Sequence, residues 1–117
     1  MEKIFDLKER SYQFGISVIK LVKLLPRNAA SHVIVDQLIR AGMSIGANIV
    51  EGNAAASKKD FINFYNHALK SAVETKYWLR SLADAELTNP EKVKPLMNEV
   101  EELSKILGSI VSKSRKR

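Results

Sequence analysis

The stretch RAGMSIGANIVEG, residues 40–52, combines helical spacing with an unusual number of glycines. Its isoleucines lie four residues apart, as they would on one face of a helix. Gly42, Gly46 and Gly52 each cost a helix interior about 1 kcal/mol relative to alanine. Glycine also removes the side chain, which lets another helix backbone approach closely. The stretch therefore predicts a helix made for close packing.

The residues around this stretch form two apolar groups on a helical wheel. One group consists of Leu38, Gly42, Ile45 and Ile49, and the other of Ile39, Met43, Gly46 and Val50. Together they cover roughly half of the circumference, which is wider than one core stripe needs. A polar seam lies opposite them, formed by Gln37, Arg40, Ser44, Asn48 and Glu51. The wide apolar arc predicts packing on two sides of the helix.

Helical periodicity extends over four segments, at about residues 7–25, 31–52, 57–85 and 90–112. Ser57 is placed to cap the third helix, with Asp60 as its capping-box partner. The fourth has Thr88 or Asn89 as its cap and Pro90 in its first turn. Pro95 then predicts that this helix either starts late or bends.

Short connections between long amphipathic helices favour antiparallel neighbours. We therefore expect an all-α, up-down-up-down four-helix bundle with a single domain at residues 1–112. No repeat or composition shift indicates a second domain. Residues 113–117 form a basic C-terminal tail.

Composition narrows the environment in which the protein works. The chain has no cysteine, so it has no disulfide and no thiolate metal site, as is usual in a reducing cytoplasm. Charged residues interrupt the first ten positions, where a signal peptide would be apolar. They also interrupt the most apolar windows, at Lys20, Lys23, Asp36 and Arg40. We expect a soluble, cytoplasmic protein without a membrane partner.

The net charge is +6, and its placement is uneven. Four of the nineteen basic residues lie in the tail, at Lys113, Arg115, Lys116 and Arg117. A second basic group lies on one side of the first helix, at Lys20, Lys23 and Arg27. Such groups either bind nucleic acid or form a solvated surface. We name both groups as candidate nucleic-acid-binding residues.

Aromatic residues in the third helix point to a partner. Tyr77 and Trp78 lie outside its apolar stripe, which consists of Phe61, Tyr65, Ala68, Ala72 and Leu79. Tyrosine and tryptophan are enriched at protein interfaces, whereas base stacking is the narrower alternative. Together with Gly42 and Gly46, they predict the interface of a homo-oligomer.

No catalytic, metal or cofactor site is evident in the sequence. Ser71, His67 and Glu74 have relay-like spacing on one helix, but acyl transfer also needs oxyanion donors and a rigid surround. Neither histidine follows a glutamate by three residues, as a di-iron bundle site requires. The G-x-x-x-G spacing lies inside a helix and lacks the Lys-Ser/Thr of a phosphate-binding loop. We expect no enzyme, no cofactor, no metal and no small-molecule substrate.

Residues 40–52 followed by SKKDFINFYNHALKSAVETKYWLRSLADA, residues 57–85, resemble the four-helix-bundle family typified by proteins encoded in intervening sequences of bacterial 23S ribosomal RNA genes. The family motif corresponds to Ser44, Asn48, Glu51 and Gly52, with further matches at Ile45, Ile49, Ser57, Phe61, Phe64, Ser71 and Glu74. More distantly, the chain is similar to accessory variability proteins of diversity-generating retroelements.

The resemblance implies a non-enzymatic bundle that assembles into a homo-oligomeric ring, with five chains in relatives. We expect this oligomer to contact structured RNA or a nucleoprotein complex through Lys20, Lys23, Arg27 and the tail. From a different class, the alternative is a structural or protein-binding scaffold with no nucleic-acid role.

Overall fold

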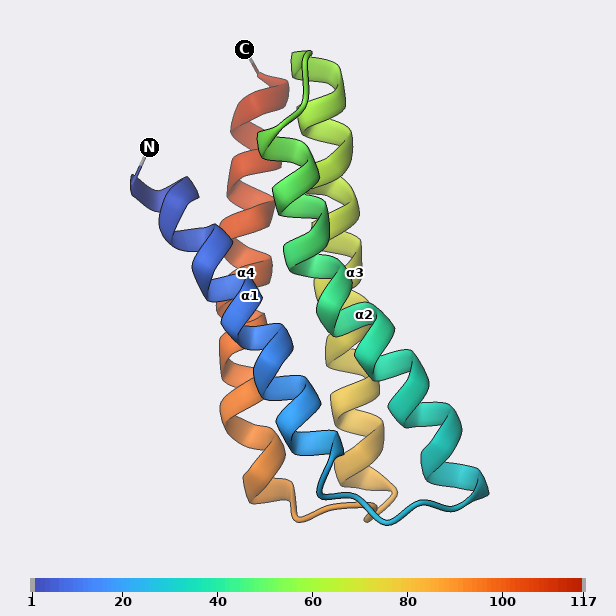
Figure 1. Ribbon diagram of the computed structural model, residues 1–117. Helices are drawn as coiled ribbons and strands as arrows, with labels where there is room; N and C mark the ends of the chain where they lie inside the picture. The colour runs from blue at the N-terminus through green and yellow to red at the C-terminus, as the bar shows by residue number, and fades with distance from the viewer. Residues whose placement is uncertain (1, 117) are drawn as a thin grey trace.

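The computed structural model describes residues 2–116, with side chains from residue 7 onward. Its four helices run antiparallel to their neighbours in the chain, so that both termini lie at one end of the bundle (Figure 1). This confirms the predicted all-α bundle. The helices are α1 (Glu2–Val22), α2 (Ala29–Asn53), α3 (Lys58–Asp84) and α4 (Pro90–Arg115).

Polar caps fix where three helices begin. Asn28 caps α2 and exchanges hydrogen bonds with Ser31, so α2 begins two residues before the predicted start. The Ser57 side chain accepts from the Asp60 amide at 3.1 Å, as the predicted cap requires. Asn89 is the cap of α4. Each such cap contributes about 1 kcal/mol of helix stability.

α1 and α4 differ from the predictions made from the sequence. α1 begins at Glu2 and ends at Val22, where residues 7–25 were expected. Pro95 lies inside α4, which begins at Pro90, so the predicted late start is wrong. Pro95 has no backbone N–H to donate. It lies in the second turn of α4, and its ring is exposed to solvent.

The core contains one apolar stripe from each helix. Leu38, Ile45 and Ile49 of α2 are fully buried, and so are Tyr65 and Leu79 of α3. Burying one such side chain contributes about 1.5 to 3 kcal/mol, so these stripes hold the bundle together. Further fully buried residues are Val18, Ala68, Ala72, Leu82, Val100, Leu103 and Leu107. The predicted stripe of α3 is confirmed except at Phe61, which is only partly buried.

Glycines allow α1 and α2 to approach within the chain. A Cβ on Gly42 would lie 3.1 Å from Cγ2 of Val18, and one on Gly46 would lie 3.5 Å from the Ser11 backbone. Gly15 of α1 packs in the same crossing, where a Cβ would meet Met43 Sδ at 2.6 Å. The predicted close packing is therefore present within one chain. Gly42 is buried there, which corrects its assignment to a surface between chains.

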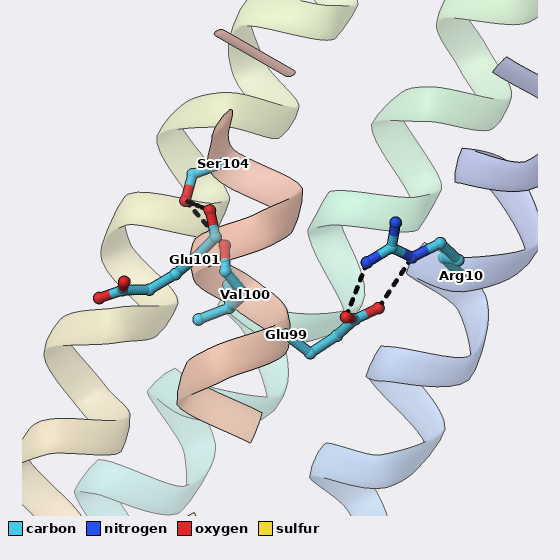
Figure 2. Close-up of polar contacts among 5 residues, drawn as sticks. All are labelled: Arg10, Glu99, Val100, Glu101 and Ser104. Atoms are coloured by element: carbon cyan, nitrogen blue, oxygen red, sulfur yellow. Dashed lines mark hydrogen bonds and ion pairs between the residues drawn. The ribbon is translucent and has the colours of Figure 1, made fainter. Parts of the chain in front are cut away.

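An ion pair joins α1 to α4, which form the smallest of the helix contacts. Arg10 donates from Nε and Nη2 to the two Glu99 carboxylate oxygens at 3.1 and 2.8 Å (Figure 2). In the same part of α4, the buried Ser104 hydroxyl donates to the Val100 carbonyl at 2.7 Å. The bidentate geometry fixes the lateral position of α1 on α4.

Within residues 2–116, only α2 is long and apolar enough to cross a membrane by length and composition. Seven residues of α2 are buried in the bundle. Core helices and signal sequences pass the same test, so one such helix is weak evidence for a membrane span.

Candidate functional site

The predicted basic residues lie at opposite ends of the bundle. Lys20 and Lys23 lie near the end of α1, and the exposed Arg27 follows in the connection to α2. The C-terminal tail lies at the other end of a molecule that is 46 Å long (Figure 1). The structure therefore does not bring the two groups together. The tail residues Lys113, Arg115 and Lys116 are exposed, whereas Arg117 lies outside the described residues.

Two basic residues that the sequence analysis did not single out lie at the same end of the bundle as the tail. Lys58 and Lys59 begin α3, which starts at the end of the bundle where α4 finishes (Figure 1). We call these two residues, together with Lys113, Arg115 and Lys116, the basic end. Antiparallel topology provided the signal that could have identified it, because the start of the third helix and the end of the fourth must share one end.

Of the two aromatic residues Tyr77 and Trp78 of α3, only Tyr77 lies outside the core. Tyr77 is 64% exposed, as expected for a side chain that needs a partner. Trp78 is half-buried and packs against the core, which corrects its placement outside it. The two rings meet edge to face at 4.9 Å, and Trp78 Nε1 donates to Glu74 at 3.0 Å. The other large exposed apolar residues are Tyr12, Leu24, Val33, Val50 and Val73.

An apolar groove of about 260 Å³ lies between α1 and α2. Gly46 forms part of its wall, and Tyr12 and Val50 are its large exposed apolar residues. Ser11 also lines it, and its buried hydroxyl has no hydrogen-bond partner in the described part of the chain. The remaining lining residues are Lys8, Glu9, Met43 and Ala47. Gly46 thus lies at the surface beside a groove, where a side chain from another molecule has access.

A second groove, of about 480 Å³, lies between α2 and α3 and is largely polar. We call it the polar groove. α2 contributes Ser44 and Asn48, and α3 contributes Phe64, His67, Lys70, Ser71 and Glu74. Asn48 Nδ2 donates to the Ser44 carbonyl at 2.8 Å and to Ser44 Oγ at 3.0 Å, which holds the α2 side in place. The groove thus gathers hydrogen-bonding groups from helices that are distant in the sequence.

Comparison with known proteins gives a family. The profile of the 23S rRNA-intervening sequence protein family matches residues 3–109. The chain belongs to this family. A crystal structure of a protein of unknown function from the S23 ribosomal protein family of Bacteroides thetaiotaomicron is similar, with 39% identity and a TM-score of 0.87. The match covers 94% of this chain and 98% of that one. No curated protein matches the chain.

The four motif residues of the intervening-sequence family, Ser44, Asn48, Glu51 and Gly52, do not share one structural role. Ser44 and Asn48 line the polar groove, whereas Glu51 is exposed at the end of α2. Gly52 is buried against Tyr65, where a Cβ would lie 2.7 Å from Cδ1 of the ring. The Tyr65 hydroxyl donates to the Asn53 side chain, and burial raises the pKa of Tyr65 to about 12. Gly52 therefore has a packing role.

The polar groove has no evident catalytic arrangement. His67, Ser71 and Glu74 line it, but no hydrogen bond joins any two of these side chains within residues 7–116. In the same part of the chain, no three His, Cys, Asp or Glu residues are grouped to hold a metal ion. The description of the matched intervening-sequence family names no enzymatic activity. What the groove offers is binding chemistry, namely a cation, a carboxylate, hydroxyls and an amide.

Proposed function

We propose that this chain is a non-enzymatic, cytoplasmic homo-oligomer that binds structured RNA, free or within a nucleoprotein complex. The observation that carries the proposal is the basic end, where five exposed lysine and arginine residues lie at one end of the bundle, at the start of α3 and at the end of α4 and just beyond it. Asp60, in the first turn of α3, and the exposed Glu51, at the end of α2, offset part of this charge. Clustered exposed cations bind phosphates without reading base sequence, so the RNA would be recognised through its backbone.

Assembly into a ring, with five chains as in the relatives the sequence resembles, would multiply this contact. Each copy adds one basic end, and several weak sites on one particle act together through effective concentration. Tyr77 and the α1–α2 groove supply exposed apolar surface of the kind that self-association buries. We propose that these surfaces form the contacts between copies. Light scattering tests the assembly, and a stable monomer at micromolar concentration would contradict it.

Fluorescence anisotropy with a structured RNA at several salt concentrations tests RNA binding. Deletion of residues 113–117 removes four basic residues. At about 0.7 to 0.9 per phosphate contact, the salt slope of log affinity should flatten by up to about 3 to 4 for each copy engaged. The oligomer should remain intact. Alanine at Lys20, Lys23 and Arg27 tests the opposite end and should have a smaller effect, because it removes three cations rather than four.

Lys105→Ala provides the matched control, since this exposed lysine lies in α4 away from the tail. It should change neither affinity nor slope. Absence of salt-sensitive binding by the intact protein would contradict RNA binding. It would favour the second candidate, a protein-binding scaffold, for which the exposed Tyr77 and the α1–α2 groove are the supporting observations.

A further inference from the structure

Two exposed apolar surfaces of the chain have opposite shapes. The α1–α2 groove is hollow, because Gly46 in its wall has no side chain, and Tyr12 and Val50 are exposed beside it. On α3, Val73 and Tyr77 are 53% and 64% exposed, and they lie one turn apart on one side of the helix. We call these two residues the α3 ridge. Packed helices place the ridges of one helix into the grooves of another.

Few exposed side chains of the chain fit the groove. Within residues 7–116, Tyr77 is the only exposed aromatic residue that does not itself line the groove. The groove has a volume of about 260 Å³, and a cavity of about 150 Å³ holds benzene, so a phenol ring fits. Leu24 and Val33 are aliphatic and lie at the opposite end of the bundle (Figure 1). Tyr77 is therefore the best match among the exposed apolar residues.

The free charges beside the two surfaces are complementary. Lys8 lines the groove, is exposed and makes no ion pair among residues 7–116. The other charge of the groove, Glu9, accepts a hydrogen bond within α1 at 2.9 Å. Beside the α3 ridge, Glu74 has no cationic partner in the same part of the chain, and only one of its oxygens accepts from an indole. The ridge cation Arg80 is already paired with Asp84 at 3.2 Å. This leaves Lys8 and Glu74 as opposite charges that a contact between copies would bring together.

We propose that Tyr77 of one copy inserts into the α1–α2 groove of a second copy, with Glu74 beside Lys8. This inference rests on the proposed self-association and specifies which surfaces meet. The α3 ridge meets the groove, and neither surface meets its own counterpart. Because the ridge and the groove lie on different helices, each copy offers one of each, and the contact repeats from copy to copy until a ring closes.

The positions of the two surfaces determine how neighbouring copies are oriented. At 1.5 Å per residue, Tyr77 lies about 28 Å and Gly46 about 10 Å from the end of the bundle where α2 finishes and α3 starts (Figure 1). Parallel copies would therefore be offset by roughly 18 Å along the bundle. A ring closes only if its bundles are inclined to the ring axis.

Mixing two variants tests which surfaces meet. Tyr77→Ala removes the ring and leaves the groove intact, whereas Val50→Glu places a charge at the groove and leaves the ridge intact. Each variant alone should associate at least about tenfold more weakly than the unaltered protein in sedimentation velocity. Fluorescently labelled Tyr77→Ala, titrated with Val50→Glu, should nevertheless form a dimer, because the intact groove of one receives Tyr77 of the other. Gly46→Leu is a second groove variant and should behave as Val50→Glu does.

Matched controls separate this contact from general surface effects. Leu24→Ala alters a side chain that is 68% exposed at the other end of the bundle, and it should leave association unchanged. Lys8→Glu should weaken association a few-fold, and adding Glu74→Lys should restore it, since an exposed pair contributes little but selects its partner by sign. Circular dichroism checks that each variant remains folded.

The possible failures are distinguishable. If Tyr77→Ala assembles as the unaltered protein does, or if the mixed variants fail to associate, the pairing of ridge and groove is overturned while the proposed assembly stands. Failure of Glu74→Lys to restore association of Lys8→Glu would overturn the contact between these two charges. A monomeric unaltered protein would overturn the proposed assembly and this contact with it, whereas RNA binding at the basic end is measured separately.

Discussion

Replacing Gly52 with alanine should destabilise the protein, although alanine is the better helix former. The new Cβ would lie 2.7 Å from Cδ1 and 2.8 Å from Cε1 of Tyr65, whereas carbon atoms in good contact are about 3.5 to 4.0 Å apart. The ring has no room to retreat. It is fully buried, it stacks on Phe61 with centroids 4.3 Å apart, and its hydroxyl donates to Asn53.

The magnitude follows from two opposing effects. Overpacking in a well-packed core costs about 1 to 3 kcal/mol. Alanine recovers up to about 1 kcal/mol of helix propensity, and less at Gly52 because α2 ends at Asn53. We expect Gly52→Ala to lower the free energy of unfolding by about 1 to 2 kcal/mol.

Gly108→Ala is the matched control, because a Cβ there would meet no atom within 4 Å. It should raise the free energy of unfolding by up to about 1 kcal/mol. Urea denaturation at one protein concentration measures both variants, with stability taken from the midpoint when the slope is unchanged. If Gly52→Ala proves as stable as Gly108→Ala, the ring does not constrain position 52 and the packing argument is wrong.

Three further predictions concern stability. Because burial raises the pKa of Tyr65 from 10.0 to about 12 in the folded protein, stability present below pH 10 should be lost as the pH rises toward 12, by roughly 3 kcal/mol. Tyr65→Phe should lack this loss in urea titrations, and a parallel decline in both proteins would contradict the prediction. A double-mutant cycle on Arg10 and Glu99 should give a coupling free energy of about 0.5 to 1 kcal/mol, since both side chains are about a third exposed. A coupling of zero would show that the ion pair does not stabilise the fold. Gly46→Ala should raise the free energy of unfolding by up to about 1 kcal/mol, because its Cβ would lie in ordinary contact, 3.5 Å from Ser11. Gly46→Leu should cost about 1 to 3 kcal/mol or disrupt assembly, and an unchanged urea midpoint and oligomer would show that the leucine enters the groove without strain.

Local features of the sequence were sufficient to predict much of the bundle. The cap at Ser57 and the stripe through Tyr65 and Leu79 depend on neighbours within a few turns, and the structure contains both. Helix ends were less predictable. Asn28 starts α2 early because its side chain reaches the Ser31 amide, a pairing hidden among several polar residues in that connection.

Features that depend on a distant partner were predicted less well. A helical wheel gives the direction of a side chain, but it does not say whether the facing helix belongs to the same chain. Gly42 was therefore assigned to a surface between chains, although Val18 of the same chain faces it. The basic residues of α1 and of the tail were likewise identified by charge alone. That Lys58 lies at the same end of the bundle as the tail follows only from the topology (Figure 1).

The stretch at residues 40–52 interleaves three pairs of residues, each with four-residue spacing. Gly42 and Gly46 face α1, Ile45 and Ile49 are buried in the core, and Ser44 and Asn48 line the polar groove with α3. At about 100° per residue, the isoleucine pair lies between the other two pairs on the wheel. α2 therefore contacts α1 on one flank and α3 on the other while the core lies between them. The glycines lower helix propensity but let α1 approach closely, whereas Ser44 and Asn48 take no part in that packing, so the face beside α3 remains open.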